Sequence, residues 1–360
     1  MSDEKLQDLR GRIDAIDARL LKLISERADY AIRIGRLKRE LEPGHSFYRP
    51  ARESVHLREL VAANDGPLQD AELTALFREI ISVCRALEQE ITVAYLGPQG
   101  TFTQEAAFKH FGRAIATQDF PTVAEVFRAV ESGKPAYGVV PVENSSEGVV
   151  THTLDCFMDS ALQIVGEIEL PIRHCLLGAG DGLGGLATVY SHQQSFAQCR
   201  RWLDDNLPGC RQVAVHSNAA AALKAHDEHN AAAIAGAGAA AGYGLNILAE
   251  GIEDYSCNAT RFLVIGGHGV PPTGGDKTSV LVSARNRPGS LAALLRILAD
   301  RGVSLTRIES RPARIVNWEY VFFLDIEGHC EDELLGRALA ELDAGAGLYK
   351  LLGSYPCAPA

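Results

Sequence analysis

Residues 94–103, Ala94-Tyr95-Leu96-Gly97-Pro98-Gln99-Gly100-Thr101-Phe102-Thr103, read as a strand, a tight glycine turn and the start of a helix. Backbone N–H groups at such a helix start bind anions. Outward from this stretch, short apolar runs alternate with helical patterns from Ile91 to about residue 268. The runs cover residues 93–96, 136–142, 163–168, 189–191, 232–235 and 262–265. This alternation predicts an α/β region with its functional residues in the loops.

The region before it, residues 1–90, is rich in charge and predicts an all-α fold. Apolar residues recur every three or four positions from Leu6 to Glu42, and Pro43-Gly44 ends the pattern. A helix of that length measures about 55 Å, too long to bury its apolar stripe within so small a domain. We therefore expect a homodimer of intertwined helices. Shorter helices are expected near residues 51–63 and 69–90.

The region after it, residues 277–356, predicts a small α+β domain. Residues 266–276 are rich in Gly and Pro and read as a linker that ends the middle region at about residue 268. Strands are expected at Thr278–Ala284, Val303–Arg311, Trp318–Ile326 and Leu348–Leu352, with helices at Ser290–Arg301 and Glu331–Leu342. This βαββαβ order is the ferredoxin-like arrangement.

The bulk composition excludes several classes of protein. The 360 residues carry a formal net charge of -11, whereas a protein that grips nucleic acid needs a basic face. The 8 cysteines are scattered without a C-x-x-C pair, so we expect reduced thiols and no metal site. No apolar run approaches the roughly 20 residues of a membrane span, and residues 1–5 do not begin a signal peptide. We expect a cytoplasmic protein of two or three domains.

The helical region resembles the all-helical class of chorismate mutases. The resemblance lies in Leu9-Arg10, Ile13, Ile16-Asp17, Glu26-Arg27, Gly35, Lys38 and Arg52-Glu53. That reaction rearranges a dianion without covalent chemistry, so catalysis needs cations that fold the substrate and donors aimed at its ether oxygen.

The helix itself limits which residues share one site. Arg27 and Lys38 are eleven residues apart and lie within about 20° on a helical wheel, so both can bracket one small dianion. Arg10 lies about 26 Å from Arg27 along the axis, and joins that site only from a partner chain unless the helix folds back.

The resemblance implies a role for each of these residues. Arg10 and Arg27 would bind the carboxylates, Lys38 the ether oxygen and Glu53 the substrate hydroxyl, with support from Arg52. Cys84 and Glu88, one helical turn apart, occupy positions where some relatives carry Ser and Gln, so Glu88 is a further candidate beside the ether oxygen. Arg49 occupies a position at which some members of this family carry an acidic residue.

The middle region resembles the prephenate dehydratases, whose two lobes flank a cleft like that of periplasmic binding proteins. Beyond the opening stretch, the resemblance lies in Gly138-Val139-Val140-Pro141-Val142-Glu143-Asn144-Ser145-Ser146-Glu147-Gly148, in Ser191-His192-x-x-Ser195-x-x-Gln198 and in Asn258-Ala259-Thr260-Arg261-Phe262. Dehydration of prephenate couples loss of carbon dioxide to departure of a ring hydroxyl. Aromatisation drives the reaction, so no metal or cofactor is expected.

The resemblance gives Thr260 the role of the acid that protonates the leaving hydroxyl. A hydroxyl is a poor acid, so its neighbours must polarise it. The candidates for positioning prephenate are Thr101, Asn144, Ser145, Ser191 and Gln198, and Arg261 is the candidate for charge balance. His192 and His216 are not expected to act as the acid, because a histidine at a strand end is usually structural.

The last region resembles the ACT domains attached to prephenate dehydratases, where phenylalanine binds at a domain interface. Arg287-Pro288-Gly289-Ser290-Leu291 opens a helix, and Glu309-Ser310-Arg311-Pro312 ends a strand. The amides of Gly289, Ser290 and Leu291 suit an amino acid carboxylate. Glu309, Ser310 and Arg311 complete the expected effector site. Together the resemblances imply a bifunctional enzyme of phenylalanine biosynthesis with feedback inhibition by phenylalanine, and dimers that could pair into tetramers.

Two other functions compete with this interpretation. Gly236-Ala237-Gly238-Ala239-Ala240-Ala241-Gly242 after a strand is similar to a dinucleotide fingerprint, which would indicate an NAD-dependent prephenate dehydrogenase of the tyrosine branch. The motif comes late, with one further strand expected before the linker, whereas a dinucleotide-binding unit opens its domain. A non-enzymatic amino acid sensor is the second alternative, against which the intact Arg10, Arg27, Lys38 and Thr260 argue.

Overall fold

The computed structural model describes residues 2–41, 48–255, 257–284, 287–313 and 320–358. The chain separates into two compact units, which are treated one at a time. The first comprises residues 1–49, 56–91 and 111–116, and the second comprises residues 50–55, 92–110 and 117–360. The predicted helix stop at Pro43-Gly44 and the predicted strand start at Trp318 lie outside the described residues.

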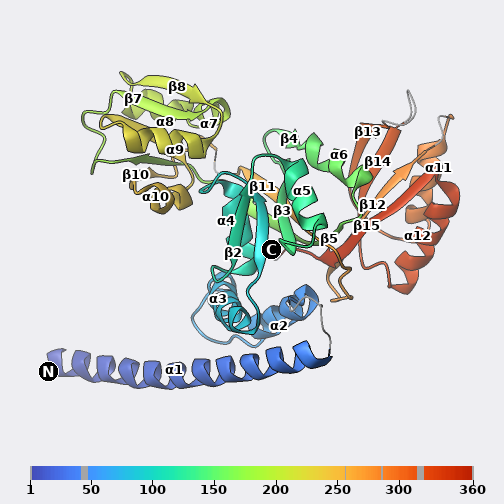
Figure 1. Cartoon of the computed structure of the whole chain (residues 1–360), viewed down its shortest axis with the longest axis horizontal. Coiled ribbons are helices and arrows are strands. Elements are labelled where there is room, and N and C mark those ends of the chain that lie inside the picture. The colour runs from blue at the N-terminus through green and yellow to red at the C-terminus, as the bar shows by residue number, and fades with distance from the viewer. Residues whose placement is uncertain (1, 42–47, 256, 285–286, 314–319, 359–360) are drawn as a thin grey trace. The chain divides into compact units, whose positions relative to one another are not determined.

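The first unit is helical, as predicted. Helix α1 (Ser2–Leu41) is a single uninterrupted helix (Figure 1). It is followed by α2 (Pro50–Ala62), which has a proline in its first turn and of which residues 50–55 belong to the second unit. Helix α3 (Asp70–Glu88) begins with a capping box between Gln69 and Glu72. Near its end α1 lies against α3, where a Cβ added to Gly35 would be 3.0 Å from the Cα of Glu88. Glycine therefore permits the two helices to approach closely.

The apolar stripe of α1 is exposed in the single chain. Its members are Leu6, Leu9, Ile13, Ile16, Leu20, Leu23, Ile24, Ile34, Leu37 and Leu41, whose exposed fractions run from 39% to 77%. Burying one such side chain contributes about 1.5–3 kcal/mol, so a stripe of this length favours association.

The second unit begins with a lobe built on one mixed sheet. Its strands are β1 (Thr92–Leu96), β2 (Ala116–Phe120), β3 (Tyr137–Asn144), β4 (Gly148–Val149), β5 (Gln163–Pro171) and β11 (Ala259–Gly266). The order is β2-β1-β3-β11-β5, and β4 pairs with β3. Helices α4 (Phe102–Phe111), α5 (Val123–Glu131) and α6 (Thr151–Asp159) belong to this lobe. Strand β11 is antiparallel to both β3 and β5, so the chain returns to this sheet after building the next lobe.

The second lobe is a five-stranded sheet in the order β10-β6-β9-β7-β8. Its strands are β6 (Cys175–Gly178), β7 (Thr188–His192), β8 (Arg211–Val215), β9 (Ala231–Ala235) and β10 (Asn246–Glu250). Its helices are α7 (Gln193–Gln198), α8 (Arg200–Asn206), α9 (Asn218–Asp227) and α10 (Ala237–Tyr243). The chain therefore crosses between the two lobes twice, at residues 172–174 and 251–258. The expectation that one strand follows the glycine motif is wrong, because both β10 and β11 follow it.

The last part is the predicted βαββαβ domain. It comprises β12 (Asp276–Ser283), α11 (Ser290–Ala299), β13 (Leu305–Pro312), β14 (Tyr320–Glu327), α12 (Glu333–Gly345) and β15 (Leu348–Pro356). Its antiparallel sheet has the order β13-β14-β12-β15, which leaves β13 at an edge.

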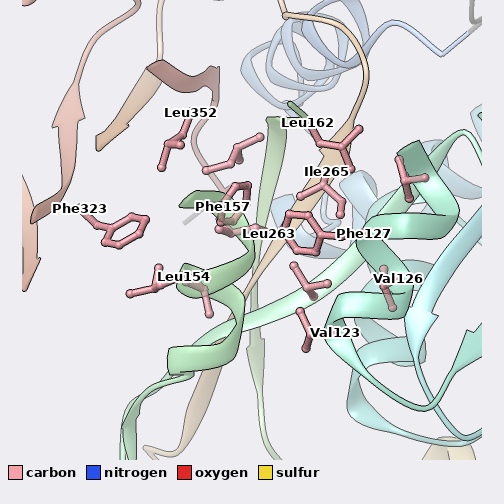
Figure 2. Packing of buried hydrophobic residues seen from close by; sticks show 14 of the residues in the cluster. Val123, Val126, Phe127, Leu154, Phe157, Leu162, Leu263, Ile265, Phe323 and Leu352 are labelled. Carbon is pink, nitrogen blue, oxygen red and sulfur yellow. The ribbon is translucent and has the colours of Figure 1, made fainter. Parts of the chain in front are cut away.

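One hydrophobic core continues from the first lobe into this last sheet. Phe127, Phe157 and Leu263 of the lobe belong to the same cluster as Phe323 and Leu352 (Figure 2). At this junction Gly353 has φ +148°, and a Cβ there would be 2.3 Å from the carbonyl oxygen of Ile164 in β5. Only glycine fits so close a backbone approach.

Candidate functional sites

Thr260 and Asn144 face each other across neighbouring strands. The register of β11 and β3 places the two residues directly opposite. The Asn144 side-chain Nδ2 donates to Thr260 Oγ1 at 2.8 Å and to Asn258 Oδ1 at 2.9 Å. Thr260 and Asn258 are both buried. Because the Thr260 oxygen accepts from Asn144, its own hydrogen points elsewhere and can be donated to another molecule.

The loop after β3 fixes the orientation of the Asn144 amide. Asn144 Oδ1 accepts the backbone N–H groups of Ser146 at 2.9 Å and Glu147 at 3.2 Å, which directs the NH₂ group toward Thr260. The Ser145 hydroxyl accepts the Ala259 N–H at 3.0 Å, and the Ser145 N–H donates to the Ala259 carbonyl at 2.9 Å. Ser145 therefore ties this loop to β11, beside Thr260.

Ser191, at the end of β7 in the second lobe, belongs to a separate cluster. It is fully buried, and its hydroxyl donates to Asn218 Oδ1 at 3.1 Å. The same oxygen accepts from the Ser195 hydroxyl at 3.1 Å and from the His192 N–H at 3.0 Å. Asn218 thus organises the strand end and the first turn of α7 around one carboxamide oxygen.

Gln198, the last residue of α7, is bound by a histidine at the first crossing between the lobes. The Nε2 atom of His174 is 2.7 Å from Gln198 Oε1, so the imidazole donates this hydrogen bond. His174 is buried, and its ring packs edge-on against Phe102. The backbone N–H of His174 donates to the Glu253 carboxylate, in the returning segment, at 2.9 Å. Burial lowers the pKa of His174 despite opposing contributions from Gln198 and Glu253. Because the Gln198 oxygen accepts from His174, the side chain offers its NH₂ group as a hydrogen-bond donor.

Thr101 lies between β1 and α4, where its hydroxyl donates to the Leu96 carbonyl at 3.1 Å. The glycine motif similar to a dinucleotide fingerprint lies against this turn. A Cβ on Gly236 would be 2.9 Å from the Phe102 ring, and one on Gly100 would be 3.1 Å from the Cα of Ala239. The glycines at these positions therefore accommodate close packing between the two lobes.

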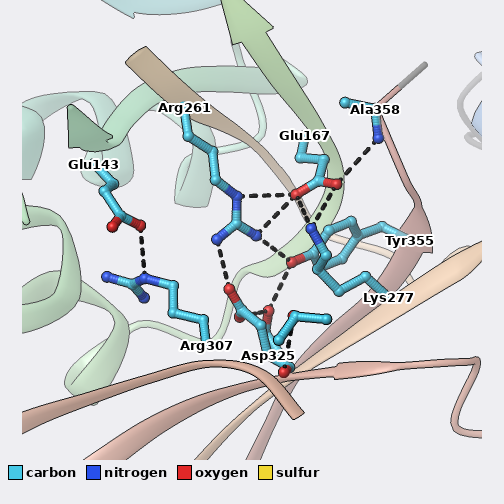
Figure 3. A network of polar contacts seen from close by, with 10 residues as sticks. Glu143, Glu167, Arg261, Lys277, Arg307, Asp325, Tyr355 and Ala358 are labelled. Atoms are coloured by element: carbon cyan, nitrogen blue, oxygen red, sulfur yellow. Dashed lines mark hydrogen bonds and ion pairs between the residues drawn. The ribbon is translucent and has the colours of Figure 1, made fainter. Parts of the chain in front are cut away.

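Arg261 is not brought to the Thr260 cluster. As the next residue of a strand it points to the opposite face. Its guanidinium contacts Glu167 of β5 at 2.8 Å, Asp325 of β14 at 2.5 Å and the Tyr355 hydroxyl of β15 at 3.1 Å (Figure 3). Arg261 therefore joins the first lobe to the C-terminal sheet. The expectation that it balances charge beside Thr260 does not fit this placement on the opposite face of the strand.

In the first unit, Lys38 and Glu88 meet where α1 lies against α3. Lys38 Nζ is 3.1 Å from Glu88 Oε2, and both side chains are mostly buried. Cys84, one turn before Glu88, is also buried. Arg27 is half-buried on α1, whereas Arg10 is exposed. Since α1 does not fold back, Arg10 lies about 42 Å from Lys38 along the axis and cannot join it within one chain.

The remaining predicted chorismate residues lie on or before α2. Arg52 and Arg49 are exposed, and Glu53 is half-buried.

The predicted effector residues occupy two places in the C-terminal domain. Gly289 precedes α11 with φ +83°, and Ser290 and Leu291 form the first turn. Glu309, Ser310 and Arg311 lie on the edge strand β13, with Ser310 exposed. The Arg311 guanidinium binds Asp155 of α6 at 3.0 Å, so it contacts the first lobe.

Comparison with known proteins assigns each region. Residues 9–89 match chorismate mutase type II, residues 93–269 prephenate dehydratase and residues 278–344 the ACT domain. The bifunctional chorismate mutase/prephenate dehydratase of Stutzerimonas stutzeri is 51% identical over 98% of both chains. The chain belongs to the bifunctional chorismate mutase/prephenate dehydratase family. It therefore has chorismate mutase and prephenate dehydratase activities in phenylalanine biosynthesis.

Solved structures agree with the predicted fold. A prephenate dehydratase from Arthrobacter aurescens in complex with L-Phe is 37% identical, with TM-score 0.69, and the match covers 74% of this chain and 90% of that one. GqqA, described as a quorum quenching acylase, is 31% identical with TM-score 0.70, and the match covers 74% of this chain and 98% of that one. Because a prephenate dehydratase and a protein described as an acylase share this fold, the fold alone does not establish the activity. The near full-length identity to bifunctional enzymes does. It also argues against the dehydrogenase and the non-enzymatic sensor.

Three contributors were missed in the sequence: Asn258, His174 and Asn218. Asn258 lies two residues before Thr260 in the quoted motif, and this position was its only signal in the sequence. No local pattern distinguishes His174 or Asn218, because their partners are distant in the chain. Among the described residues no helix is long and apolar enough to cross a membrane, and no three metal-binding side chains cluster.

Proposed function

We propose that Thr260 protonates the leaving hydroxyl of prephenate and that Asn144 enables it to do so. The hydrogen bond from Asn144 Nδ2 to Thr260 Oγ1 carries this proposal. Donation onto the oxygen stabilises negative charge that develops there as the proton leaves, so the hydroxyl becomes a better acid in a buried setting.

The bond changes at prephenate follow from this assignment. The bond between the ring and its carboxylate breaks and releases carbon dioxide, and its electron pair enters the ring. The ring C–O bond breaks at the same time, and the hydroxyl leaves as water with the Thr260 proton. Thr260 regains a proton from solvent. The NH₂ group of Gln198 is suited to a carboxylate, while Ser145, Ser191 and Thr101 shape the strand ends around the substrate.

Thr260→Val tests the role of Thr260, because valine keeps the shape of threonine and removes the hydroxyl. We expect dehydratase kcat to fall about 1,000-fold, in the range of general acid catalysis, with mutase kcat unchanged in the same sample. Thr260→Ser keeps a hydroxyl and should retain more of the rate. A folded Thr260→Val protein with wild-type dehydratase kcat would show that Thr260 is not the acid.

The mutase site is proposed at Lys38 and Glu88, in a homodimer. Lys38 would bind the ether oxygen, Arg27 a carboxylate, and Arg10 of the second chain the other carboxylate. The exposed stripe of α1 and the separation of Arg10 from Lys38 both support a second chain. Glu88 would lie beside the ether oxygen, to which it can donate only while it holds a proton, with Cys84 next to it. Arg52 and Glu53 would complete the site from α2.

Phenylalanine is the proposed effector of the ACT domain. One support is the L-Phe complex of the Arthrobacter aurescens relative. A second is the exposed edge of β13, which can pair with another chain and so form an interface near Ser310. The amides of Gly289, Ser290 and Leu291 would receive the carboxylate, with Glu309 and Ser310 opposite them. Association of dimers into tetramers and a cytoplasmic location stay predictions.

A further inference from the structure

Strands β3 and β11 carry a second cross-strand pair directly beside Thr260 and Asn144. The register that places Thr260 opposite Asn144 also places Arg261 opposite Glu143. Side chains alternate along a strand, so the two pairs point to opposite faces of the sheet. The face that does not carry Thr260 therefore presents one cation and one anion.

The ACT sheet presents the complementary charges. Its β13–β14 register places Arg307 opposite Asp325. Arg307 Nε is 2.7 Å from Glu143 Oε2, and Arg261 Nη1 is 2.5 Å from Asp325 Oδ2 (Figure 3). We call Glu143, Arg307, Arg261 and Asp325 the ion-pair quartet. Each sheet thus supplies one cation and one anion, and each of these pairs with the opposite charge on the other sheet.

The quartet is held firmly on both sides. Only 13% of the Arg307 side chain, 12% of Arg261 and 7% of Asp325 is exposed, although 37% of Glu143 is. Ser279 donates to the second Asp325 oxygen at 2.5 Å. A cavity of about 10 Å³, room for about one water molecule, is the space left beside Arg261, Arg307 and Asp325. Because this cavity is so small, the quartet side chains cannot rearrange much if the ACT sheet moves.

The electrostatics agree with this geometry. Burial pushes the pKa of Asp325 upward, but the charge of Arg261 and the Ser279 hydrogen bond outweigh it and hold the pKa below its ordinary value. Asp325 is therefore ionised at neutral pH, as the ion pair with Arg261 requires.

We propose that the ACT sheet positions Thr260 and Asn144 through the ion-pair quartet, so that Arg307 and Asp325 are positioning residues of the dehydratase. This rests on the role proposed above for Thr260. Each member on the first lobe is the chain neighbour of a reacting or polarising residue, so a shift of Glu143 or Arg261 moves Asn144 or Thr260 with it. Small misplacements of a catalytic group lower the rate steeply.

Arg307→Met is the variant that tests this, because methionine fills much of the same space and removes the charge. We expect dehydratase kcat to fall about 10-fold with KM for prephenate changed less than about 2-fold, since positioning acts on the transition state. Mutase kcat should not change. Arg337→Met is the matched control, because Arg337 loses the same charge from an exposed pair with Glu333 on α12.

Two further measurements separate positioning from a structural role. Arg307→Lys keeps the charge and should restore part of the lost kcat. In a Glu143→Gln background, Arg307→Met should add less than about 2-fold, because the two residues act through one contact. Full kcat in a folded Arg307→Met protein would overturn the proposal, and so would a loss equal in both backgrounds. Thr260→Val, assayed alongside, shows which proposal is wrong if Arg307→Met keeps full kcat. If Thr260→Val also keeps full kcat, Thr260 is not the acid. If Thr260→Val loses kcat, only the proposed role of the quartet is wrong.

Discussion

The mutase and dehydratase regions solve the problem of binding a small dianion in different ways. In the mutase region the expected cations Arg10, Arg27 and Lys38 lie along one helix, and Arg10 and Lys38 cannot meet within a chain. In the dehydratase region Thr260, Asn144 and Asn258 form a complete hydrogen-bonded cluster within one chain. A long helix separates residues in proportion to their spacing, whereas a sheet brings distant residues into register. With the proposed site residues, the mutase site therefore needs a second copy of the chain, whereas the proposed dehydratase site does not.

Removing a mutase cation should give the largest effect and should leave the other region intact. We expect Lys38→Ala to lower mutase kcat/KM at least about 1,000-fold, because the charge at the ether oxygen then develops without a cation. Dehydratase turnover of supplied prephenate, measured on the same protein, should match wild type. Equal loss of both activities in a folded variant would mean that the two sites are not separate.

A mixed dimer tests the need for a second chain directly. Arg10→Ala and Lys38→Ala, co-expressed with different tags, should give a heterodimer with one intact site and one site that lacks both residues. We expect about half the wild-type mutase activity in the purified heterodimer. Activity no higher than in either homodimer would show that each site is built within one chain.

Within the dehydratase, the hydrogen bond from His174 to Gln198 can be removed without disturbing the Thr260 cluster. We expect His174→Phe, which keeps an aromatic ring beside Phe102, to raise KM for prephenate about 10-fold, because Gln198 loses the partner that orients its amide. His174→Gln can still donate and should recover part of the affinity. An unchanged KM in His174→Phe would contradict the proposal that Gln198 binds a carboxylate of prephenate.

His174 also predicts how stability depends on pH. Its folded pKa lies below the ordinary value of 6.5, so below that pH the unfolded chain takes up a proton that the folded chain resists. Stability is therefore lost as pH falls from about 6.5 toward the folded pKa. Thermal unfolding at pH 7.5 and 5.5 should show a larger loss for wild type than for His174→Phe, and an equal loss would contradict the assignment.

Regulation should be separable from both chemistries. We expect Ser310→Ala to raise the phenylalanine concentration for half inhibition several-fold and to leave uninhibited dehydratase turnover unchanged, because an effector acts only through its differential affinity for two states. Ser304→Ala, which removes the hydroxyl of an exposed serine just before β13, is the control. Wild-type protein that binds phenylalanine in calorimetry without any change in rate would defeat the assignment.

The smallest effect concerns Glu88. A carboxyl group donates a hydrogen bond only while it holds a proton, whereas glutamine donates at every pH. We expect Glu88→Gln to stay active, and its mutase activity at saturating chorismate to decline less on the alkaline side than that of wild type. Superimposable pH profiles would place Glu88 outside the reaction.

The amino-acid sequence determined the elements with strong periodicity and the motifs that are local in the chain. The long helix followed from its apolar spacing, and βαββαβ followed from alternating patterns at 277–356. Asn144 and Thr260 were predicted as site residues because each belongs to a continuous motif at a strand end. The strands β2, β8 and β10 were missed because they lie at sheet edges and carry polar residues, while β4 and β6 are too short to show a period.

Only the tertiary structure decided which partner each polar side chain meets. Arg261 adjoins Thr260 in sequence but points to the other face of the strand, where it binds Asp325 of the ACT sheet. Gln198 binds His174, and Gly236 of the glycine motif packs against Phe102. Periodicity reports whether a side chain faces a core, but the choice of ion-pair or hydrogen-bond partner depends on strand register and on contacts between residues far apart in the chain.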